Sequence, residues 1–452
     1  MNVSANKMLM TEGSISRKLI SFTVPIFIGN LFQQLYNTAD TLIVGRFLGN
    51  DALAAVSATG SLVFLMISFF SGIAQGAGVA IARYFGAGDK ERLKKAVHTN
   101  MCLSLIGCVI LTLLGVFCTE AFLRLMGTPE DILPSSAEYI RIIFAGSTGM
   151  VIYNSCCGIM QAVGDSIHPL QYLIISSVTN VILDIVFIVI FHGGVGSAAL
   201  ATIISQCLSA ALCLTRLMRT KEDHRIRINA LRLDRTLASE IIRYGIPSGL
   251  QNSVIAIANV VVQSNINAFG KMAVAGCGAY AKIEGFAFLP INSFTTALTT
   301  FVGQNLGAGK YDRAKKGARF GIFCCMGLAE FVGIVIFILA KPLVSAFTQE
   351  AEAIAFGVLK MRTTSLFFFL LAASHSLSSV LRGAGRAVIP MISMLSFWCI
   401  FRVIFISVMT PIVKSIAVVN WVYPLTWSLS AIFLVIYYIK ADWVHSFGRK
   451  KA

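Results

Sequence analysis

The sequence predicts an all-α polytopic membrane protein of twelve transmembrane helices, arranged as two six-helix lobes related by a parallel internal repeat. Three observations lead to this prediction: the composition, the length of the apolar segments and a duplication. Hydrophobic residues make up 56% of the 452 positions, charged residues make up 13%, and the mean hydropathy is +0.77. Soluble globular proteins carry roughly 25% charged residues, so this composition excludes that class.

Apolar segments of transmembrane length recur along the whole chain between charged or Gly/Pro-rich breaks. A helix needs about 20 predominantly apolar residues to cross the hydrocarbon core of a bilayer. The expected spans cover residues 20–44, 53–80, 99–118, 138–160, 170–191, 196–215, 241–264, 276–302, 320–340, 355–380, 388–411 and 416–439.

The duplication is clearest at two glycine-rich turns, each followed by a basic helix. The first reads RYFGAGDKERLKKAV from Arg83, and the second reads GQNLGAGKYDRAKKGAR from Gly303. Gly86 and Gly307 lie 221 positions apart in these turns. The same offset joins Gly88 to Gly309, Arg92 to Arg313, Lys94–Lys95 to Lys315–Lys316, Gly49 to Gly270, Arg141 to Arg362, Gly164 to Gly385 and Pro169 to Pro390, and Pro25 meets Pro247 at an offset of 222. A constant offset across half the chain indicates an internal repeat.

Each half then contains six spans, and an even number returns the chain to the side from which it started. The two halves therefore share one orientation, as in transporters whose repeats are related by an axis along the membrane normal. The predicted domains are an N-terminal lobe at residues 1–215, a cytoplasmic linker at 216–236 and a C-terminal lobe at 237–452. Two similar bundles around a central cavity are a common basis for alternating access, so the architecture suggests transport.

The net charge of +16 is explained by topology. Most of the 37 Lys and Arg residues fall in alternate breaks, and the positive-inside rule then places both termini in the cytoplasm of a multi-pass protein of the cell (inner) membrane. We therefore expect no nucleic-acid partner. The basic stretch 216–235 is interpreted as a solvated connector in preference to a lipid-headgroup or regulatory patch.

The sequence lacks several motifs of known chemistry. The glycine-rich turns do not have the G-x-x-x-x-G-K-[ST] spacing of a phosphate-binding loop, so they are interpreted as tight turns between helices. The eleven cysteines lie almost all in apolar segments and form no C-x-x-C, which favours small buried side chains over a zinc site or a redox pair. We expect no catalytic residue, no cofactor and no resident metal, and the energy must come from an ion gradient or the solute's own gradient.

The stretch FTVPIFIGNLFQQLYNTAD places Asp40 within the first span. An ionised Asp at the centre of a membrane helix costs about 2.5–3.5 kcal/mol, so such residues usually face water, a partner or a transport pathway. Pro25 removes a backbone hydrogen bond and is predicted to bend this helix. Gln33, Tyr36 and Asn37 lie close to the acid and either bind solute, extend a proton network or pack against other helices.

A second group of oxygen-bearing side chains lies in the fifth and sixth spans. Asn180 and Asp184 are four residues apart and share a helix face, and Thr202 lies about one turn into the next span. These oxygens suit Na⁺, and the two carboxylates equally suit proton exchange; a purely structural hydrogen-bonded pair is the alternative. At the repeat offset Asp40 meets a valine and Asp184 meets Phe405, so the acids belong to one half, as a single coupling site requires.

The spans of the second half contain their own isolated polar residues. Glu284 is a candidate to bind a cationic solute, or it pairs with Lys282 or Arg402. His375 has no second ligand at metal spacing and is expected to be a core or cavity residue.

As a set, several segments resemble the MATE family of multidrug and toxic compound extrusion transporters over essentially the whole chain. They are VPIFIGNLFQQLYNTADTLIVGRFLG with the following DALAAVS, the paired GAG turns with their basic helices, GIMQAVGD at 158–165 and FLPINSFTTALTTFVGQNLGAGK at 288–310. The resemblance implies a twelve-helix export antiporter whose lobes open alternately to each side, exchanging organic cations or other amphipathic drugs for H⁺ or Na⁺.

The DinF-like branch of that family is the most similar to this sequence. The resemblance assigns cation coupling to Asp40, Asn180, Asp184 and Thr202, with Na⁺ a candidate ligand of the last three. It also places Gln33 and Tyr36 in the same cavity and Pro25 at the bend. The NorM-like branch carries a Glu about two turns after the proline of the seventh span, where this chain has Ile255, so a second-lobe cation site of that kind is not expected.

We therefore predict a secondary active exporter of amphipathic, cationic compounds that works by H⁺ or Na⁺ antiport, is no enzyme and acts as a monomer in the lipid bilayer. The alternative is a flippase of lipid-linked or polyprenyl-type substrates, which would need a wide basic cavity where this sequence has acids. An integral-membrane enzyme acting on lipid would need a nucleophile with its base, or a metal, near the interface, and the sequence shows no such set.

Overall fold

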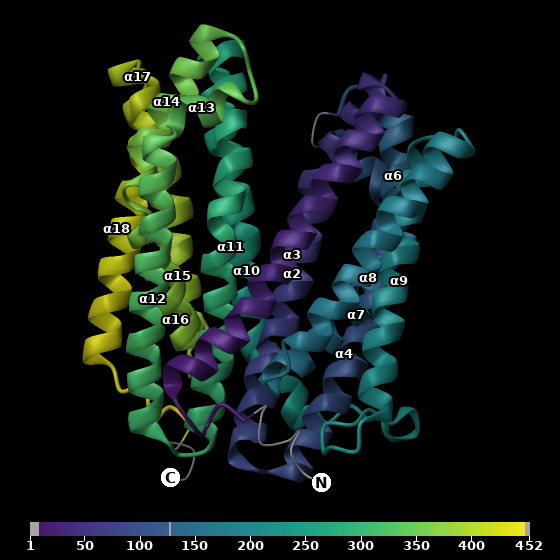
Figure 1. The fold of residues 1–452 in the computed structure, drawn as a ribbon, viewed down its shortest axis with the longest axis vertical. Coiled ribbons are helices and arrows are strands. Elements are labelled where there is room, and N and C mark those ends of the chain that lie inside the picture. Colours follow the sequence, from purple (N-terminus) through teal and green to yellow (C-terminus); the bar gives the residue numbers. More distant parts are fainter. Residues whose placement is uncertain (1–8, 126–127, 448–452) are drawn as a thin grey trace. The chain divides into compact units, whose positions relative to one another are not determined.

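The computed structural model describes residues 9–125 and 128–447, and within these ranges all regular structure is helical (Figure 1). The chain forms two compact units. Unit 1 includes Val24–Gly249, and unit 2 combines Met10–Thr23 with the chain from Leu250 onward. Two helices belong to both units: α2 (Ile15–Phe47) begins in unit 2 and continues in unit 1, and α10 (Arg235–Asn267) begins in unit 1 and continues in unit 2.

The remaining helices divide between the units in chain order. Unit 1 contains α3 (Asn50–Ala87), α4 (Lys90–Phe117), α5 (Thr119–Leu125), α6 (Leu133–Ala145), α7 (Ser147–Ala162), α8 (Ile167–Asp184), η1 (Ile185–Ile190), α9 (Val195–Arg219) and η2 (Ile228–Ala230). Unit 2 contains α11 (Lys271–Gly307), α12 (Tyr311–Ile338), α13 (Ala340–Ser345), α14 (Ala351–Ser365), α15 (Phe368–Gly383), α16 (Val388–Ser393), η3 (Met394–Phe401), α17 (Arg402–Val413) and α18 (Ile416–Lys440).

The helices confirm the predicted fold class. Across the described ranges, 10 helical segments are long and apolar enough to cross a membrane. Two further spans are helix pairs, α6–α7 bent by 47° and α14–α15 bent by 54°, which raises the total to the predicted 12. The sequence predicted each of these spans, 138–160 and 355–380, as one apolar segment.

Neighbouring helices satisfy the backbone at both bends. In unit 1 the hydroxyl of Thr112 on α4 donates to the carbonyl of Phe144 at the end of α6, at 3.1 Å. In unit 2 a carboxylate oxygen of Glu330 on α12 accepts the N–H of Phe369 at the start of α15, also at 3.1 Å. A membrane helix tolerates a break where neighbours replace the lost hydrogen bonds, so tertiary contacts permit both bends.

The same packing pattern recurs in both units, as the repeat predicts. In unit 1, α7 packs against α3, α4 and α9. In unit 2, α15 packs against α11, α12 and α18 (Figure 1). Each central helix is thus the second half of a bent span, surrounded by equivalent neighbours.

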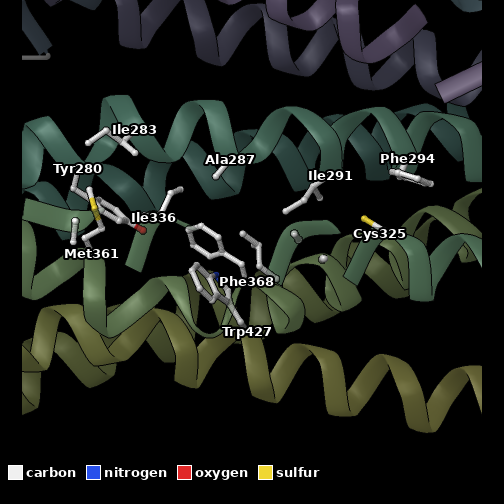
Figure 2. Close-up of a cluster of buried hydrophobic side chains, with 14 of the residues drawn as sticks. Tyr280, Ile283, Ala287, Ile291, Phe294, Cys325, Ile336, Met361, Phe368 and Trp427 are labelled. Atoms are coloured by element: carbon white, nitrogen blue, oxygen red, sulfur yellow. The ribbon is translucent and has the colours of Figure 1, made fainter. Parts of the chain in front are cut away.

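A continuous apolar core holds unit 2 together (Figure 2). The rings of Phe368 and Trp427 are each 1% exposed, and their centroids lie 6.0 Å apart. Tyr280 and Met361 extend the same cluster beside Ile336. This dense packing matters for function because it fixes the Tyr280 ring, whose hydroxyl belongs to a buried polar group described below.

The predicted tight turns are confirmed at both glycine-rich motifs. Gly88 ends α3 with φ of 67°, and Gly309 follows α11 with φ of 69°. Residues with a Cβ adopt this left-handed region only at a cost, which explains the glycines. After the first turn, Asp89 caps α4 by accepting the N–H of Arg92 at 3.1 Å.

Candidate functional site

The acids of the first half come together in unit 1. Asp40 on α2 and Asp184 at the end of α8 bring their carboxyl groups close enough to share a proton. Asp184 is fully buried and Asp40 is half-buried. Among the described residues, no donor reaches either oxygen of Asp184 or Oδ1 of Asp40. Two carboxylates without donors repel each other strongly in a medium of low dielectric, so this pair requires a proton or a cation.

The packing of α8 on α9 brings the other predicted ligands to the same level. Ser176 Oγ donates to the carbonyl of Ser205 at 2.6 Å, which fixes the register of this antiparallel pair. Counting along both helices from that bond places Asn180 level with Thr202. Asn180 is 2% exposed, and within the described ranges neither atom of its amide group has a hydrogen-bond partner. The Thr202 hydroxyl donates to the carbonyl of Ala198 at 3.1 Å, and its oxygen lone pairs remain.

Tyr36 connects the acid pair to further polar groups. Its hydroxyl is hydrogen-bonded to Gln33 and Gln206, and it interacts electrostatically with Asp40 and Asp184. Gln206 lies about one turn after Thr202 on α9, so extending the predicted polar face of that helix would have found it. The structure thus brings four predicted residues into one polar network: Gln33, Tyr36, Asp40 and Asp184. The network also includes Gln206, which was not predicted.

Two further residues show the limits of the sequence pattern. Asn37, a predicted substrate contact, is exposed, and in the described part of the chain its side chain makes no hydrogen bond to the acid pair. Tyr139 on α6 was not predicted, yet it lies close enough to interact electrostatically with both acids. It also packs against a buried apolar cluster that includes Val44 of α2. No spacing rule points to Tyr139, because it comes from a different helix.

A π-helical segment follows the buried acid directly. η1 begins at Ile185, the residue after Asp184. The fifth span of unit 2 has a similar segment, η3, which ends immediately before Arg402. Wide turns of this kind often occur at functional sites, since an extra residue redirects the side chains on either side. By contrast, α2 runs without interruption through Pro25, so the bend at that residue stays a prediction.

Glu284 belongs to a separate polar cluster in unit 2. Its Oε1 accepts the Tyr280 hydroxyl at 2.7 Å, and that hydroxyl accepts the Thr364 hydroxyl at 2.9 Å. Lys360 and Arg402 are 4% and 1% exposed, and both lie close enough to attract the Glu284 carboxylate.

Lys282, one of the predicted partners of Glu284, is exposed and forms no ion pair within the described residues, so that alternative is wrong. Lys360 on α14, which is separated from α11 in the chain by α12 and α13, is the lysine that attracts the Glu284 carboxylate. Arg402, the other predicted partner, forms no ion pair with Glu284 in the described ranges and only attracts the carboxylate electrostatically.

Aromatic rings surround both cations of this cluster. Lys360 Nζ lies 4.9 Å from the ring centroid of Tyr280 and 5.0 Å from that of Tyr423. The Arg402 guanidinium lies 4.7 Å from the Tyr423 ring and donates to the Thr426 hydroxyl at 2.9 Å. Cation–π contacts partly replace the lost hydration. With two cations and one acid, the cluster carries excess positive charge.

His375, the isolated histidine of the second half, packs between aromatic rings. His375 lies between the rings of Phe288 and Trp398, with centroid distances of 5.8 and 5.4 Å, which agrees with the predicted core or cavity role. In the ranges that the structure describes, no three His, Cys, Asp or Glu side chains come together as metal ligands would.

Comparisons with known proteins agree with this architecture. The MatE family model matches residues 25–186 and again 247–408, an offset of 222 residues that equals the distance between Pro25 and Pro247. The chain is 30% identical over 438 residues to the probable multidrug resistance protein YoeA of Bacillus subtilis, which covers 95% of this chain and 94% of that relative.

Two more distant comparisons concern substrate and fold. The chain is 26% identical over 355 residues to a protein of Shewanella oneidensis named FAD transporter, covering 76% of this chain and 77% of that relative. Among solved structures, an outward-facing multidrug resistance MATE family transporter of the MOP superfamily superposes with a TM-score of 0.88 at 25% identity, covering 95% and 96% of the two chains.

Proposed function

The chain belongs to the MatE family of membrane transporters, and from this premise we propose that it exports amphipathic organic cations by antiport against H⁺ or Na⁺. In the proposed topology both termini are cytoplasmic, and the two lobes open alternately to each side of the cell membrane. The acids of unit 1 couple the two fluxes.

The observation that carries this proposal is a set of buried oxygen atoms without donors around Asp184. The set comprises both carboxylate oxygens of Asp184, Oδ1 of Asp40, Oδ1 of Asn180 and Oε1 of Gln206. Buried acceptors in folded proteins are normally satisfied, so an orphaned group of them needs an explanation. A proton shared by the two carboxyls, or a Na⁺ ion ligated by carboxylate and amide oxygens, supplies it.

In the proposed cycle the coupling ion binds between Asp40 and Asp184 from the outside and removes their repulsion. The α2 helix then bends at Pro25, the cavity of the first lobe narrows, and the solute leaves outward. Release of the ion to the cytoplasm restores the repulsion and resets the transporter. A membrane potential of 100 mV is worth roughly 2.3 kcal/mol for each charge moved, so one coupling ion already concentrates solute appreciably.

Efflux from proteoliposomes tests the coupling. The experiment follows a fluorescent organic cation while a pH gradient and a Na⁺ gradient are imposed separately. We expect gradient-driven efflux in the wild-type protein and a loss of at least tenfold in Asp40→Asn and Asp184→Asn, because an amide cannot exchange the proton and binds Na⁺ weakly. The gradient that drives efflux identifies the ion.

Glu330→Gln provides the matched control, since Glu330 is a half-buried acid of α12 whose acceptor role a glutamine can retain. It should transport as the wild type does. Wild-type rates in both Asp variants would contradict the proposal. No response to either gradient would favour the flippase alternative instead.

The excess positive charge around Lys360 and Arg402 favours a second candidate, export of anionic amphiphiles. The relative named FAD transporter is consistent with this candidate, because FAD is an anion. Replacing the fluorescent cation by FAD in the same proteoliposomes separates the two: efflux of FAD alone supports the anion candidate, and efflux of the cation alone excludes it.

A further inference from the structure

Unit 1 contains a cavity that the transport site does not use. It has a volume of about 800 Å³ and opens between the start of α4 and the connecting segment 221–234. Six basic side chains line it: Lys94, Lys95, Lys221, Arg225, Arg227 and Arg232. The cavity lies where α4 and α10 begin and α9 ends, at the ends of three helices long and apolar enough to cross a membrane.

The connecting segment is mostly exposed, and it is also folded against α4. The N–H of Arg227 donates to Nε2 of His98 at 3.1 Å, and the N–H of Asp234 donates to the hydroxyl of Thr99 at 3.2 Å. Two consecutive residues of α4 therefore hold the segment at two points. Ile226, only 2% exposed, anchors it further into the protein.

The buried histidine of this segment adds no charge to the cavity. His224 is 6% exposed, and burial lowers its pKa despite the nearby carboxylates of Asp165 and Asp223. Its imidazole is therefore neutral at physiological pH.

Three acids, Glu222, Asp223 and Asp234, also line the cavity and balance only part of its six basic side chains. Asp223 forms ion pairs with Lys90 at 3.2 Å and with Lys94 at 3.7 Å. Asp234 caps α10 by accepting the N–H groups of Thr236 and Leu237, both at 3.0 Å. The basic residues left over are Lys95, Lys221, Arg227 and Arg232, whose side chains have no hydrogen bond or ion pair among the described residues.

In the second copy of the repeat, basic residues at the start of α12 hold another segment of the chain. There the segment before α2 packs on the start of α12. Arg313 donates to the carbonyls of Met10, Glu12 and Gly13 at 2.7–3.2 Å. Lys310 donates to the carbonyl of Thr11 at 3.0 Å. At the repeat offset Arg313 corresponds to Arg92, which does not line the cavity. Lys315 and Lys316, which correspond to the cavity residues Lys94 and Lys95, are exposed.

We propose that this cavity binds an organic phosphate with two or more negative charges, held by the unpaired side chains of Lys95, Arg227 and Arg232. Guanidinium groups bind phosphate oxygens through two parallel hydrogen bonds, and the volume lies within the range of small-molecule sites. The phosphate belongs either to the headgroup of an anionic lipid or to a soluble ligand, since the two share this chemistry.

Thermal unfolding of the full-length protein tests the site in two arms. The soluble arm uses nanodiscs of phosphatidylcholine and titrates inorganic pyrophosphate. The lipid arm compares phosphatidylcholine nanodiscs with nanodiscs that contain cardiolipin. In the arm that matches the natural source, we expect the wild-type midpoint to rise with ligand and the effect to weaken with added salt.

Variants of the cavity identify where the ligand binds. In the double variant Arg227→Ala with Arg232→Ala, the ligand concentration needed to raise the thermal midpoint should increase at least tenfold. The double variant Arg227→Lys with Arg232→Lys should recover part of the wild-type response. The control is Lys315→Ala with Lys316→Ala. These exposed residues of α12 correspond to Lys94 and Lys95 in the repeat, and the variant should respond like the wild type. The altered arginines are exposed, so the unliganded midpoint reports folding independently.

A response to pyrophosphate assigns a soluble phosphate, and a response to cardiolipin alone assigns a lipid. The proposal is overturned if neither arm shifts the wild type. It is equally overturned if the Arg227 and Arg232 variants respond as the wild type does.

Discussion

At the scale of single residues, Asp184 and Glu284 show how surroundings separate two membrane acids. Asp184 lies beside the carboxyl group of Asp40, and in the described ranges no donor reaches it. Glu284 receives a hydrogen bond from Tyr280 and lies near the cations Lys360 and Arg402. The first acid therefore needs an ion from outside the protein, whereas the second is balanced from within.

This contrast predicts a structural coupling between Glu284 and Lys360. Glu284→Gln should lower the unfolding free energy by about 1–3 kcal/mol, because it leaves buried positive charge without its counter-charge. Lys360→Met added to that variant should recover most of the loss. Thermal unfolding of both single variants and the double variant in detergent measures the coupling.

Additive effects in this cycle would show that the two side chains do not interact. Glu330→Gln combined with Lys360→Met serves as the control pair and should be additive, since Glu330 instead caps the start of α15.

At the scale of helices, close backbone contacts decide where α3 meets the beginning of α10. Both segments carry a G-x-x-x-G motif, Gly72 with Gly76 and Gly245 with Gly249. A Cβ added at Gly76 would overlap the backbone of Gly245, and one added at Gly72 would overlap that of Gly249. Small residues at this spacing allow membrane helices to touch along their backbones, so the motifs specify this crossing.

Gly76→Leu should therefore destabilise unit 1, because the two backbones cannot separate without losing their packing. We expect a loss of about 1–3 kcal/mol or more in unfolding free energy, measured as a lower thermal midpoint in detergent. Gly60→Leu is the matched control on the same helix, since nothing lies within 4 Å of a Cβ at that position. Equal midpoints for the two variants would refute the role of the glycine contact.

At the scale of the whole chain, the two units exchange the beginnings of their first helices. Residues 10–23 belong to unit 2, although the rest of α2 belongs to unit 1, and α10 crosses in the opposite sense at Gly249. The crossings lie two residues or fewer from Pro25 and Pro247. Each half of the repeat therefore contributes one segment to the other unit.

The Arg313 side chain is predicted to hold the first of these exchanged segments. Arg313→Ala removes its bonds to the carbonyls of Met10, Glu12 and Gly13. Amide exchange of residues 10–14, measured by mass spectrometry, should accelerate on the order of tenfold. Arg92→Ala, the repeat equivalent in unit 1, should leave that exchange unchanged, and unchanged exchange in Arg313→Ala itself would disprove the clamp.

The primary structure alone was sufficient for the fold class, the number of spans, the repeat and the confinement of Asp40 and Asp184 to one half. These features depend on the length of the apolar segments, on residue spacing and on the repeat offset, all of which can be read directly from the order of residues along the chain. It was also sufficient to place Asn180 on the face of Asp184, because four residues make about one helical turn.

Packing between distant segments decided the rest. Four features join residues from different helices. Lys360, and not Lys282, lies near Glu284, and Tyr139 approaches the two acids. Thr112 and Glu330 stabilise the bends, and segment 221–234 folds over α4. In a bilayer every helix is apolar on its outside, so hydropathy cannot say which faces meet. Shape, hydrogen bonds and buried charge make that selection only once the helices are assembled.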